Sequence, residues 1–166
     1  TGHLAVSTLH TNTAVATINR IIDIFPPGEQ EQVRVQLASV LEAVISQRLL
    51  PRADGDGRVL TCEIMRATPA IRNLIREVQT EQIYSQIQMG SSLGMQTLNS
   101  SLAQLTKQGK ISERSAKNMS PDLKELNREL RHTARLNEQN AVLNRVLRHN
   151  VRNDMNVVMG YAKELQ

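Results

Sequence analysis

The stretch Thr1–Ala14, TGHLAVSTLHTNTA, predicts the beginning of an α/β fold. Leu4–Leu9 is a short, mostly apolar run with β-branched members, a pattern typical of an interior strand. Asn12 or Thr13 can then cap a helix that follows. The buried side of that helix is expected to hold Ala14, Ile18, Ile21 and Ile22.

Two histidines, His3 and His10, lie at the ends of this predicted strand and are seven positions apart. On one flat strand they would face opposite sides, so we place His10 in the loop between the strand and the helix. Ligands of open α/β sheets bind at such loops, and a helix N-terminus there favours phosphate. The residues alone leave two interpretations open, a ligand site or a structural pair of histidines.

The middle of the chain is predicted to hold a helix followed by a hairpin. Phe25–Gln30, FPPGEQ, is a turn and a helix start, and apolar residues recur at helical spacing from Val33 to Ile45, which predicts a helix reaching Gln47. Pro51–Val59, PRADGDGRV, contains two turn signals of the Asp-Gly type and predicts a hairpin. Further helices are expected at roughly 68–78, 80–88, 93–108 and 112–118, and from Pro121 to the end.

Composition limits the classes of protein. A length of 166 residues suits one ordinary domain, and an aromatic content of 2% requires an aliphatic and mostly helical core. The net charge of +4 comes without Lys/Arg runs or stacking aromatics, so no nucleic-acid partner is expected. Cys62 is the only cysteine, which excludes an intramolecular disulfide and a cysteine zinc cluster; no metal site is predicted. No run of apolar residues is long enough to span a membrane.

The octapeptide Ala70–Glu77, AIRNLIRE, follows Thr68 as the expected N-cap and Pro69 at the first helical position. Its predicted buried face holds Ile71, Leu74, Ile75 and Val78. Arg72 and Arg76 lie four positions apart on the other side, where two like charges cost a few tenths of a kcal/mol in an isolated helix. Acidic partners on a neighbouring surface would offset that cost; a solvated face is the alternative.

The composition changes near residue 127. Residues 127–166 hold seven Lys/Arg and four Asp/Glu, against thirteen and twelve in residues 1–126. An apolar stripe from Leu136 to Leu165 suits a helical hairpin or a coiled-coil dimer. His149 points away from this stripe, and its neighbours Asn150, Arg152 and Asn153 could help it to accept a phosphoryl group. An exposed histidine without a role is the alternative.

Residues 1–128 carry several motifs of one family. TGHLAVSTLHTNTA resembles the His box of the secretion and pilus-motor ATPases, and the stretch from Ile18 to Arg52 resembles the same family without a gap. DGDGRV, EIM, TPAIRNLIRE and GMQTL follow at the expected places. AIRNLIRE resembles the signature of the PilT-type retraction ATPases of type IV pili, as distinct from extension and type II secretion ATPases.

This resemblance implies an α/β fold that becomes mostly α. Residues 1–67 would form the C-terminal part of a RecA-like ATPase core, and 68–127 a helical C-terminal region. Residues 128–166 are expected to form a long helix that resembles the dimerisation and phosphoacceptor helix of histidine kinases. The resemblance to the ATPase family implies a hexameric, ATP-driven motor of twitching motility that uses ATP and Mg²⁺. It also implies a cytoplasmic place at the inner membrane, with a pilus platform protein as partner.

The same resemblance assigns roles to residues. His3 and His10 would be His-box residues near the phosphates of the nucleotide. The retraction motif, expected at a subunit or domain contact, would be Ala70, Ile71, Arg72, Asn73, Leu74, Ile75, Arg76 and Glu77.

One departure from the family concerns nucleotide hydrolysis. The sequence contains no G-x-x-x-x-G-K-[ST] loop and no acidic Walker B strand. Hydrolysis of this kind requires both a phosphate-binding loop and carboxylates for Mg²⁺ and water. We therefore expect a C-terminal fragment that does not hydrolyse ATP alone; an inactive helical interaction protein is the alternative.

The tail resembles a second family. Leu143–Leu165, LNRVLRHNVRNDMNVVMGYAKEL, resembles the H-box helix of sensor histidine kinases of the haloarchaeal type. This resemblance implies that His149 is the phosphoacceptor, with Asn150, Arg152 and Asn153 completing the box in a helix able to dimerise. The second helix and the catalytic domain of such kinases are missing from the sequence, so the tail would act in trans. A chimera or a fusion joined near residue 127 follows from the two resemblances together.

Overall fold

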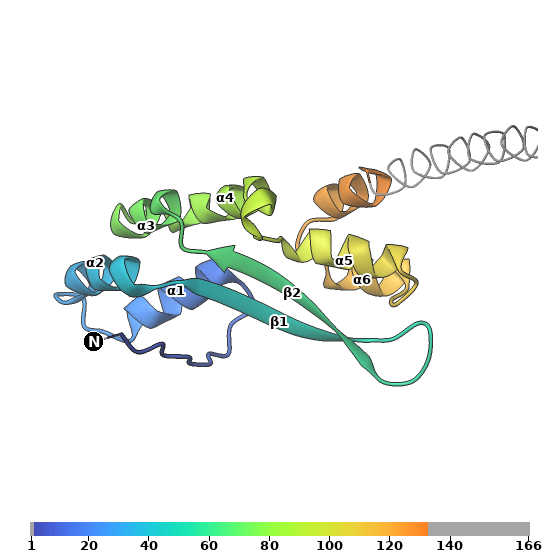
Figure 1. Ribbon diagram of the computed structural model, residues 1–166, viewed down its shortest axis with the longest axis horizontal. Coiled ribbons are helices and arrows are strands. Elements are labelled where there is room, and N and C mark those ends of the chain that lie inside the picture. The colour runs from blue at the N-terminus through green and yellow to red at the C-terminus, as the bar shows by residue number, and fades with distance from the viewer. Residues whose placement is uncertain (1, 133–166) are drawn as a thin grey trace, which may run out of the picture.

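The computed structural model describes residues 2–132, which form helices around one long hairpin (Figure 1). The elements in chain order are α1 (Ala14–Asp23), α2 (Gln30–Val40), β1 (Ala43–Pro51), β2 (Arg58–Arg66), α3 (Pro69–Arg76), η1 (Thr80–Gln82), α4 (Ile83–Met89), η2 (Ser91–Leu93), α5 (Leu98–Lys107) and α6 (Glu113–Met119). Residues 123–132 are also helical. The expected change from α/β to mostly α is confirmed, and no helix within residues 2–132 is long and apolar enough to cross a bilayer.

The hairpin confirms the turn predicted over Pro51–Val59. β1 and β2 pair antiparallel from Ala43 opposite Arg66 to Pro51 opposite Arg58. The connecting loop closes with a hydrogen bond from the Arg52 N–H to the Gly57 carbonyl, 3.2 Å. Gly57 has a φ of 95°, a conformation that residues with a Cβ rarely adopt, which explains a glycine at this place in the loop.

The helix predicted to reach Gln47 is too long. α2 ends at Val40, and β1 begins at Ala43. Along β1, buried Val44 and Leu50 lie on one face, while Ile45 and Leu49 on the other face are exposed. An adjacent apolar pair such as Val44 and Ile45 is compatible with either a helix or a strand, so the sequence pattern is ambiguous here. This segment forms a strand because it pairs with β2.

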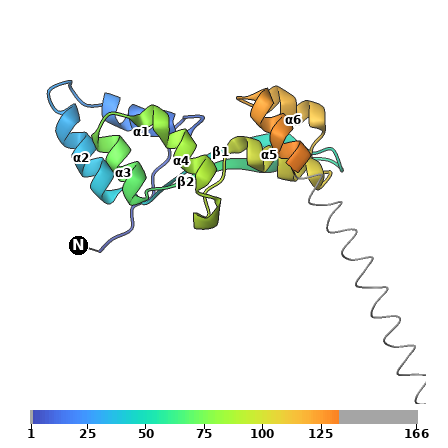
Figure 2. The same cartoon turned by 90° about the horizontal axis from the view of Figure 1, so that it is seen from above.

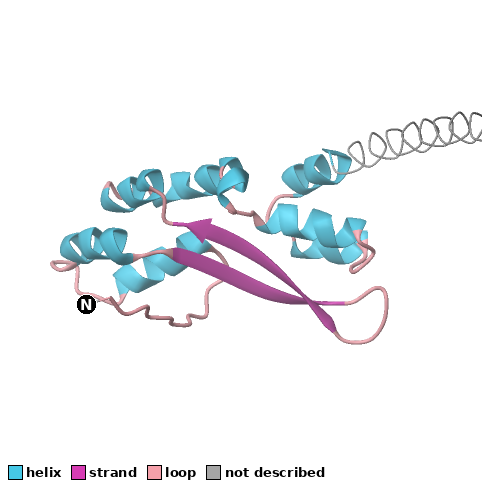
Figure 3. Cartoon of the chain, viewed as in Figure 1, coloured by secondary structure: helices cyan, strands magenta, loops and turns pink. Residues whose placement is uncertain are grey.

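The strand predicted at Leu4–Leu9 does not form. Figure 3 draws this segment as a loop, and Leu4 and Val6 are 83% and 86% exposed. A strand needs a neighbour that pairs with its backbone. Across residues 2–132, the hairpin pairs outside its own two strands only in an isolated bridge between Ile64 and Gln96, so the segment has no partner.

Helix starts follow the capping residues of the sequence. The Thr13 hydroxyl accepts the Ala16 N–H, and the Thr68 hydroxyl accepts the Ile71 N–H, with Pro69 at the first helical position, as predicted. The helix predicted at 93–108 begins only at Leu98 because Gln96 pairs with β2. The caps therefore set most helix starts, and sheet pairing overrides the helical pattern at this one.

Apolar side chains gather in two clusters. The first lies among α1–α4 and the start of the hairpin: Ala14, Ile18, Ile22, Ala38, Val44, Met65, Ile71, Ile75, Ile83, Ile87 and Met95. The second lies among α5, α6 and the helix over 123–132: Leu50, Leu98, Leu102, Ala103, Ile111, Ala116 and Leu126. Figure 2 shows the two groups of helices at opposite ends of the hairpin, which contributes to both clusters.

Candidate functional site

A strip of polar side chains crosses the inner face of the hairpin between the two apolar clusters. We call Ser46, Arg48, Thr61 and Glu63 the polar strip; Ser46 lies opposite Glu63, and Arg48 lies opposite Thr61. Ser46, Thr61 and Glu63 are at most 5% exposed. The strip continues the buried face of both strands, where apolar residues occupy the positions on either side.

Two members of the polar strip contact the end of the N-terminal segment. The Glu63 carboxylate accepts the Ala14 N–H at 2.7 Å, and the Arg48 guanidinium donates to the Asn12 carbonyl at 3.3 Å. Burial raises the pKa of the Glu63 carboxyl, whereas the hydrogen bond from Ala14 and the charge of Arg48 lower it. The hairpin therefore holds the turn between the predicted His box and α1.

The N-terminus of α1 is already occupied by oxygen acceptors. The Ala14 N–H donates to Glu63, and the Ala16 N–H donates to the Thr13 hydroxyl. A carboxylate is stabilised at a helix N-terminus for the same reason as a phosphate. The expected phosphate preference of this helix end is thus met within the protein by Glu63, a residue that the sequence interpretation missed.

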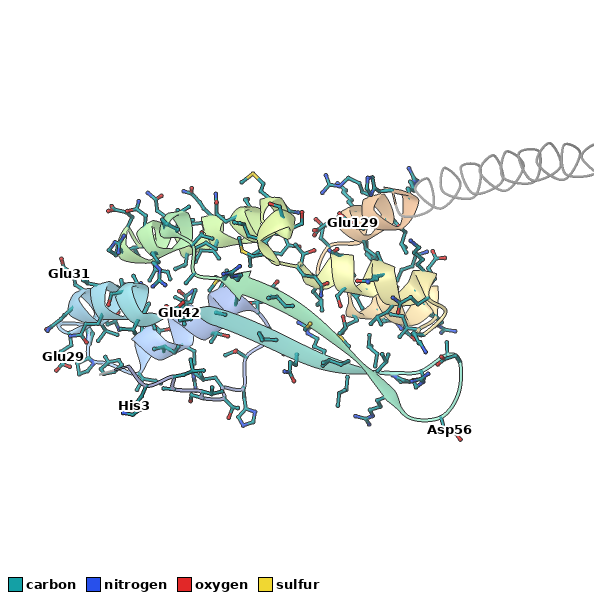
Figure 4. All side chains as sticks on the ribbon, viewed as in Figure 1. His3, Glu29, Glu31, Glu42, Asp56 and Glu129 are labelled. Carbon is teal, nitrogen blue, oxygen red and sulfur yellow. The ribbon has the colours of Figure 1, made fainter. Side chains whose placement is uncertain are left out.

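The two histidines of the predicted His box lie on the exposed N-terminal segment. Both His3 and His10 are exposed, and Figure 4 shows His3 on the outer side of the segment, pointing away from the helices. His10 lies two residues before Asn12, close to the contact with Arg48. Their role near nucleotide phosphates stays a prediction.

The motif Ala70–Glu77 forms α3 and its C-terminal cap. Ile71 and Ile75 are fully buried as predicted, and Leu74 packs against the first apolar cluster. Val78 was expected in the same buried face but is 60% exposed. The helix ends at Arg76, and Val78 has a φ of 60°, so the helical spacing no longer applies to it.

The two arginines of α3 have different surroundings. Arg72 donates to the carbonyls of Ala38 and Ser39 at 2.7 and 3.0 Å and forms an ion pair with Glu42 at 3.1 Å. Its expected acidic partner is therefore within the same chain, beside the end of α2. Arg76 is exposed and has no side-chain hydrogen bond or ion pair to any residue of the described range 2–132.

The remaining polar members of the motif face outward with Arg76. Asn73 and Glu77 are exposed, as is Ala70. The exposed side of α3 and its cap thus carries the Asn73 amide, the Arg76 guanidinium and the Glu77 carboxylate, whereas the side chain of Arg72 is mostly buried.

A second buried polar group lies where α4, α5 and the helix over 123–132 meet. Glu125 is 4% exposed and accepts hydrogen bonds from neutral donors: the Tyr84 hydroxyl, Gln88 Nε2 at 3.0 Å, Thr97 Oγ1 at 3.4 Å and Asn99 Nδ2 at 2.7 Å. We call these five residues the Glu125 cluster. Burial first, and then the hydrogen bond to Glu125, raise the pKa of the Tyr84 hydroxyl. The cluster joins the two groups of helices.

Two further kinds of site were considered in the sequence analysis, a metal site and a phosphoacceptor. No group of three or more His, Cys, Asp or Glu within residues 2–132 could hold a metal ion. The predicted phosphoacceptor His149, with Asn150, Arg152 and Asn153, lies outside the described residues. A signal for the missed pair Arg48 and Glu63 was present in the sequence, since they lie on the alternating buried face of the two strands.

A match to a family model defines the class of protein. The family model described as "Type II/IV secretion system protein" matches residues 1–130, and the chain belongs to this family. The match ends before most of the tail.

Two relatives are similar to this chain over most of its length. The chain is 52% identical over 117 residues both to the "Twitching motility protein" of Neisseria gonorrhoeae and to the "Type IV pilus retractation ATPase PilT" of Pseudomonas aeruginosa. Each alignment covers 70% of this chain, and 31% and 34% of the two relatives respectively. The chain thus spans about a third of the length of these relatives.

Solved structures show the same similarity. The crystal structure of the pilus retraction motor PilT with bound ADP matches with a TM-score of 0.63 and 52% identity, over 72% of this chain and 33% of that one. The Legionella pneumophila ATPase DotB matches with a TM-score of 0.55 and 23% identity, over 66% of this chain and 30% of that one, and shows similarity of fold alone. These matches confirm the resemblance to the retraction ATPases that the motifs predicted.

Proposed function

We propose that this chain is the C-terminal part of an ATP-driven motor that retracts type IV pili. The observation that carries the proposal is the 52% identity to a retraction ATPase over 117 residues, together with the motif Ala70–Glu77 within the family match. In this proposal the motor is a hexamer at the cytoplasmic side of the inner membrane, and it acts on a pilus platform protein.

The nucleotide of this motor would be ATP with Mg²⁺, consistent with the ADP in the similar PilT crystal structure. The described residues do not fit a complete nucleotide site, because the sequence has no phosphate-binding loop and Glu63 occupies the N-terminus of α1. His3 and His10 would approach phosphates that residues outside this chain bind. The chain alone is therefore expected to be inactive as an ATPase.

The contact surface of this motor would lie on the outer side of α3. Asn73, Arg76 and Glu77 are exposed there, and Arg76 has no partner in residues 2–132. An exposed arginine with free donors suits an acidic surface on a neighbouring subunit or on the platform protein. Arg72, by contrast, is assigned to the interior of this chain.

A hybrid motor tests the proposal. Residues 1–130 would replace the matching third of Pseudomonas aeruginosa PilT in a strain without that gene, and twitching zones and ATP turnover would be measured separately. The expected result is ATP turnover and restored twitching, with twitching lost in the hybrid that carries Arg76→Ala. A hybrid that hydrolyses ATP at the parental rate and restores no twitching would contradict a role in retraction.

A further inference from the structure

The position of His10 depends on the turn that follows it, because no segment of residues 2–132 pairs as a strand with the stretch before that turn. Within residues 2–132, the side-chain hydrogen bonds of the turn are those of Arg48 with Asn12 and of Glu63 with Ala14, together with bonds of Thr11 and Thr13 to α1 itself. Two side chains of the hairpin therefore supply the anchors from outside the segment and its own helix.

We propose that Arg48 and Glu63 are positioning residues for His10. In the proposed motor they would set where the imidazole lies relative to the phosphates. Neither residue would touch the nucleotide. Only the role of His10 near the phosphates rests on the proposed function.

The chain between the anchors and His10 is short. His10 precedes Asn12 by two residues, and two residues span at most about 7 Å even when extended. If the Asn12 carbonyl or the Ala14 N–H is displaced, His10 is therefore expected to move with it, because only a short stretch of chain separates them. His3, further along the exposed segment, is not held in this way.

Glu63 is a fixed anchor because it is buried. Its side chain is 3% exposed, and its acceptor atom lies 2.7 Å from the Ala14 nitrogen, a short hydrogen bond for a backbone donor. Burial raises the pKa of the Glu63 carboxyl, and its place at the positive end of the α1 dipole opposes that effect.

Arg48 connects the same turn to the second group of helices. Its Nη1 atom lies 3.0 Å from the Met119 sulfur at the end of α6, while its Nη2 atom donates to Asn12. Its buried Nε–H has no partner in the described range, and neither has the nearby Ser46 hydroxyl on the same face.

Thr61 extends this connection through the hairpin. Its hydroxyl donates to the Ser101 hydroxyl of α5 at 2.9 Å, so the polar strip contacts α1 on one side and α5 and α6 on the other. A shift of α6 relative to the hairpin would therefore reach the turn before α1 through Arg48, which contacts both Met119 and Asn12.

Histidine NMR on the full chain tests the inference without nucleotide. The sequence has four histidines, His3, His10, His132 and His149, so isotope-labelled histidine gives four ring signals, which His10→Gln assigns in part. Glu63→Ala and Arg48→Ala are each expected to move the His10 signals and to leave those of His132 and His149 in place. Glu63→Gln, which keeps an oxygen acceptor for the Ala14 N–H, is expected to restore the His10 position. The matched control is Glu42→Ala, an exposed glutamate just before β1.

Each outcome decides the question. General destabilisation would move the His132 signals as well, because His132 lies in the helix over 123–132, whereas positioning moves the His10 signals without them. A folded Glu63→Ala protein with unchanged His10 signals, or a Glu63→Gln protein that behaves like Glu63→Ala, would overturn the inference. If Glu63→Ala does not fold, Arg48→Ala decides, because it leaves the cap of α1 intact. The hybrid-motor experiment is independent of these signals, so the two proposals fail separately.

Discussion

Substituting the two arginines of α3 one at a time should separate their roles. Arg72→Ala removes hydrogen bonds to the carbonyls of Ala38 and Ser39 at the end of α2 and the ion pair with Glu42. Arg76→Ala removes no side-chain hydrogen bond or ion pair within residues 2–132. Both changes remove the same charge and give the same helix-forming residue, so each variant controls for the other.

The size of the Arg72 effect follows from its three contacts. A hydrogen bond to a charged group contributes about 1.5 kcal/mol at the low end of its range, so the two carbonyl contacts at 2.7 and 3.0 Å would contribute about 3 kcal/mol if they were fully shielded from water. The Glu42 side chain is 75% exposed, and such an ion pair adds at most about 0.5 kcal/mol. Since Arg72 is itself 21% exposed and water can replace part of these bonds, we expect a loss of about 2 kcal/mol.

Urea denaturation followed by circular dichroism measures this loss. Arg72→Ala should lower the free energy of unfolding by about 2 kcal/mol and the melting temperature by roughly 5–10 °C. Arg76→Ala should change the free energy of unfolding by less than about 0.5 kcal/mol. Equal losses in the two variants, or a larger loss for Arg76→Ala, would refute the assignment of Arg72 to the interior and of Arg76 to an outside partner.

Other predictions concern buried and exposed groups. Glu125→Ala leaves several buried donors without an acceptor and should lower the free energy of unfolding by about 3 kcal/mol or more, whereas Tyr84→Phe should lower it by about 1 kcal/mol. Urea denaturation of both variants measures these losses, and a smaller loss for Glu125→Ala than for Tyr84→Phe would contradict the prediction. Hydrogen bonds from Arg52 and, to a smaller extent, from Lys110 lower the pKa of the Asp54 carboxyl from 3.8 to about 2. The contribution of Asp54 to stability is therefore present above about pH 4 and is lost as the pH falls towards 2. Carboxylate NMR titration should give that midpoint, and an ordinary midpoint would show that the contact does not persist in solution. If the tail is a phosphoacceptor, labelled ATP and a separate kinase catalytic domain should label the wild-type chain, and label that survives in His149→Gln would exclude this site.

Local signals predicted much of the fold. Thr13, Thr68 and Pro69 mark helix starts because capping depends on a few neighbouring residues, and the glycine-rich turn marks the hairpin. The errors lie where the secondary structure of one segment depends on pairing with a segment far away in the sequence. β1 is a strand because β2 pairs with it, and Leu4–Leu9 is not a strand because no segment of residues 2–132 pairs with it.

The site was predictable to a smaller extent. His10 was placed correctly in a loop before a capped helix, since that needs only the local order of residues. Glu63 was missed because the Ala14 N–H that it accepts lies 49 positions away in the sequence. Arg48 was missed because the predicted helix extended to Gln47, which hid the alternation of buried residues along β1. Contacts of this kind depend on the register of the hairpin, which spacing along one strand does not determine.

The placement of the hairpin has a consequence for how this protein loses its structure. Val44 and Met65 belong to the first apolar cluster and Leu50 to the second, so one pair of strands carries side chains of both. Unfolding of either group of helices would expose one end of the same hairpin to water, which favours a single cooperative transition over two separate ones. A chain cut after residue 67 would lose Ile71 and the other α3 and α4 members of the first cluster. Limited proteolysis is therefore expected to proceed from intact chain to small peptides, without a stable intermediate that ends near that residue.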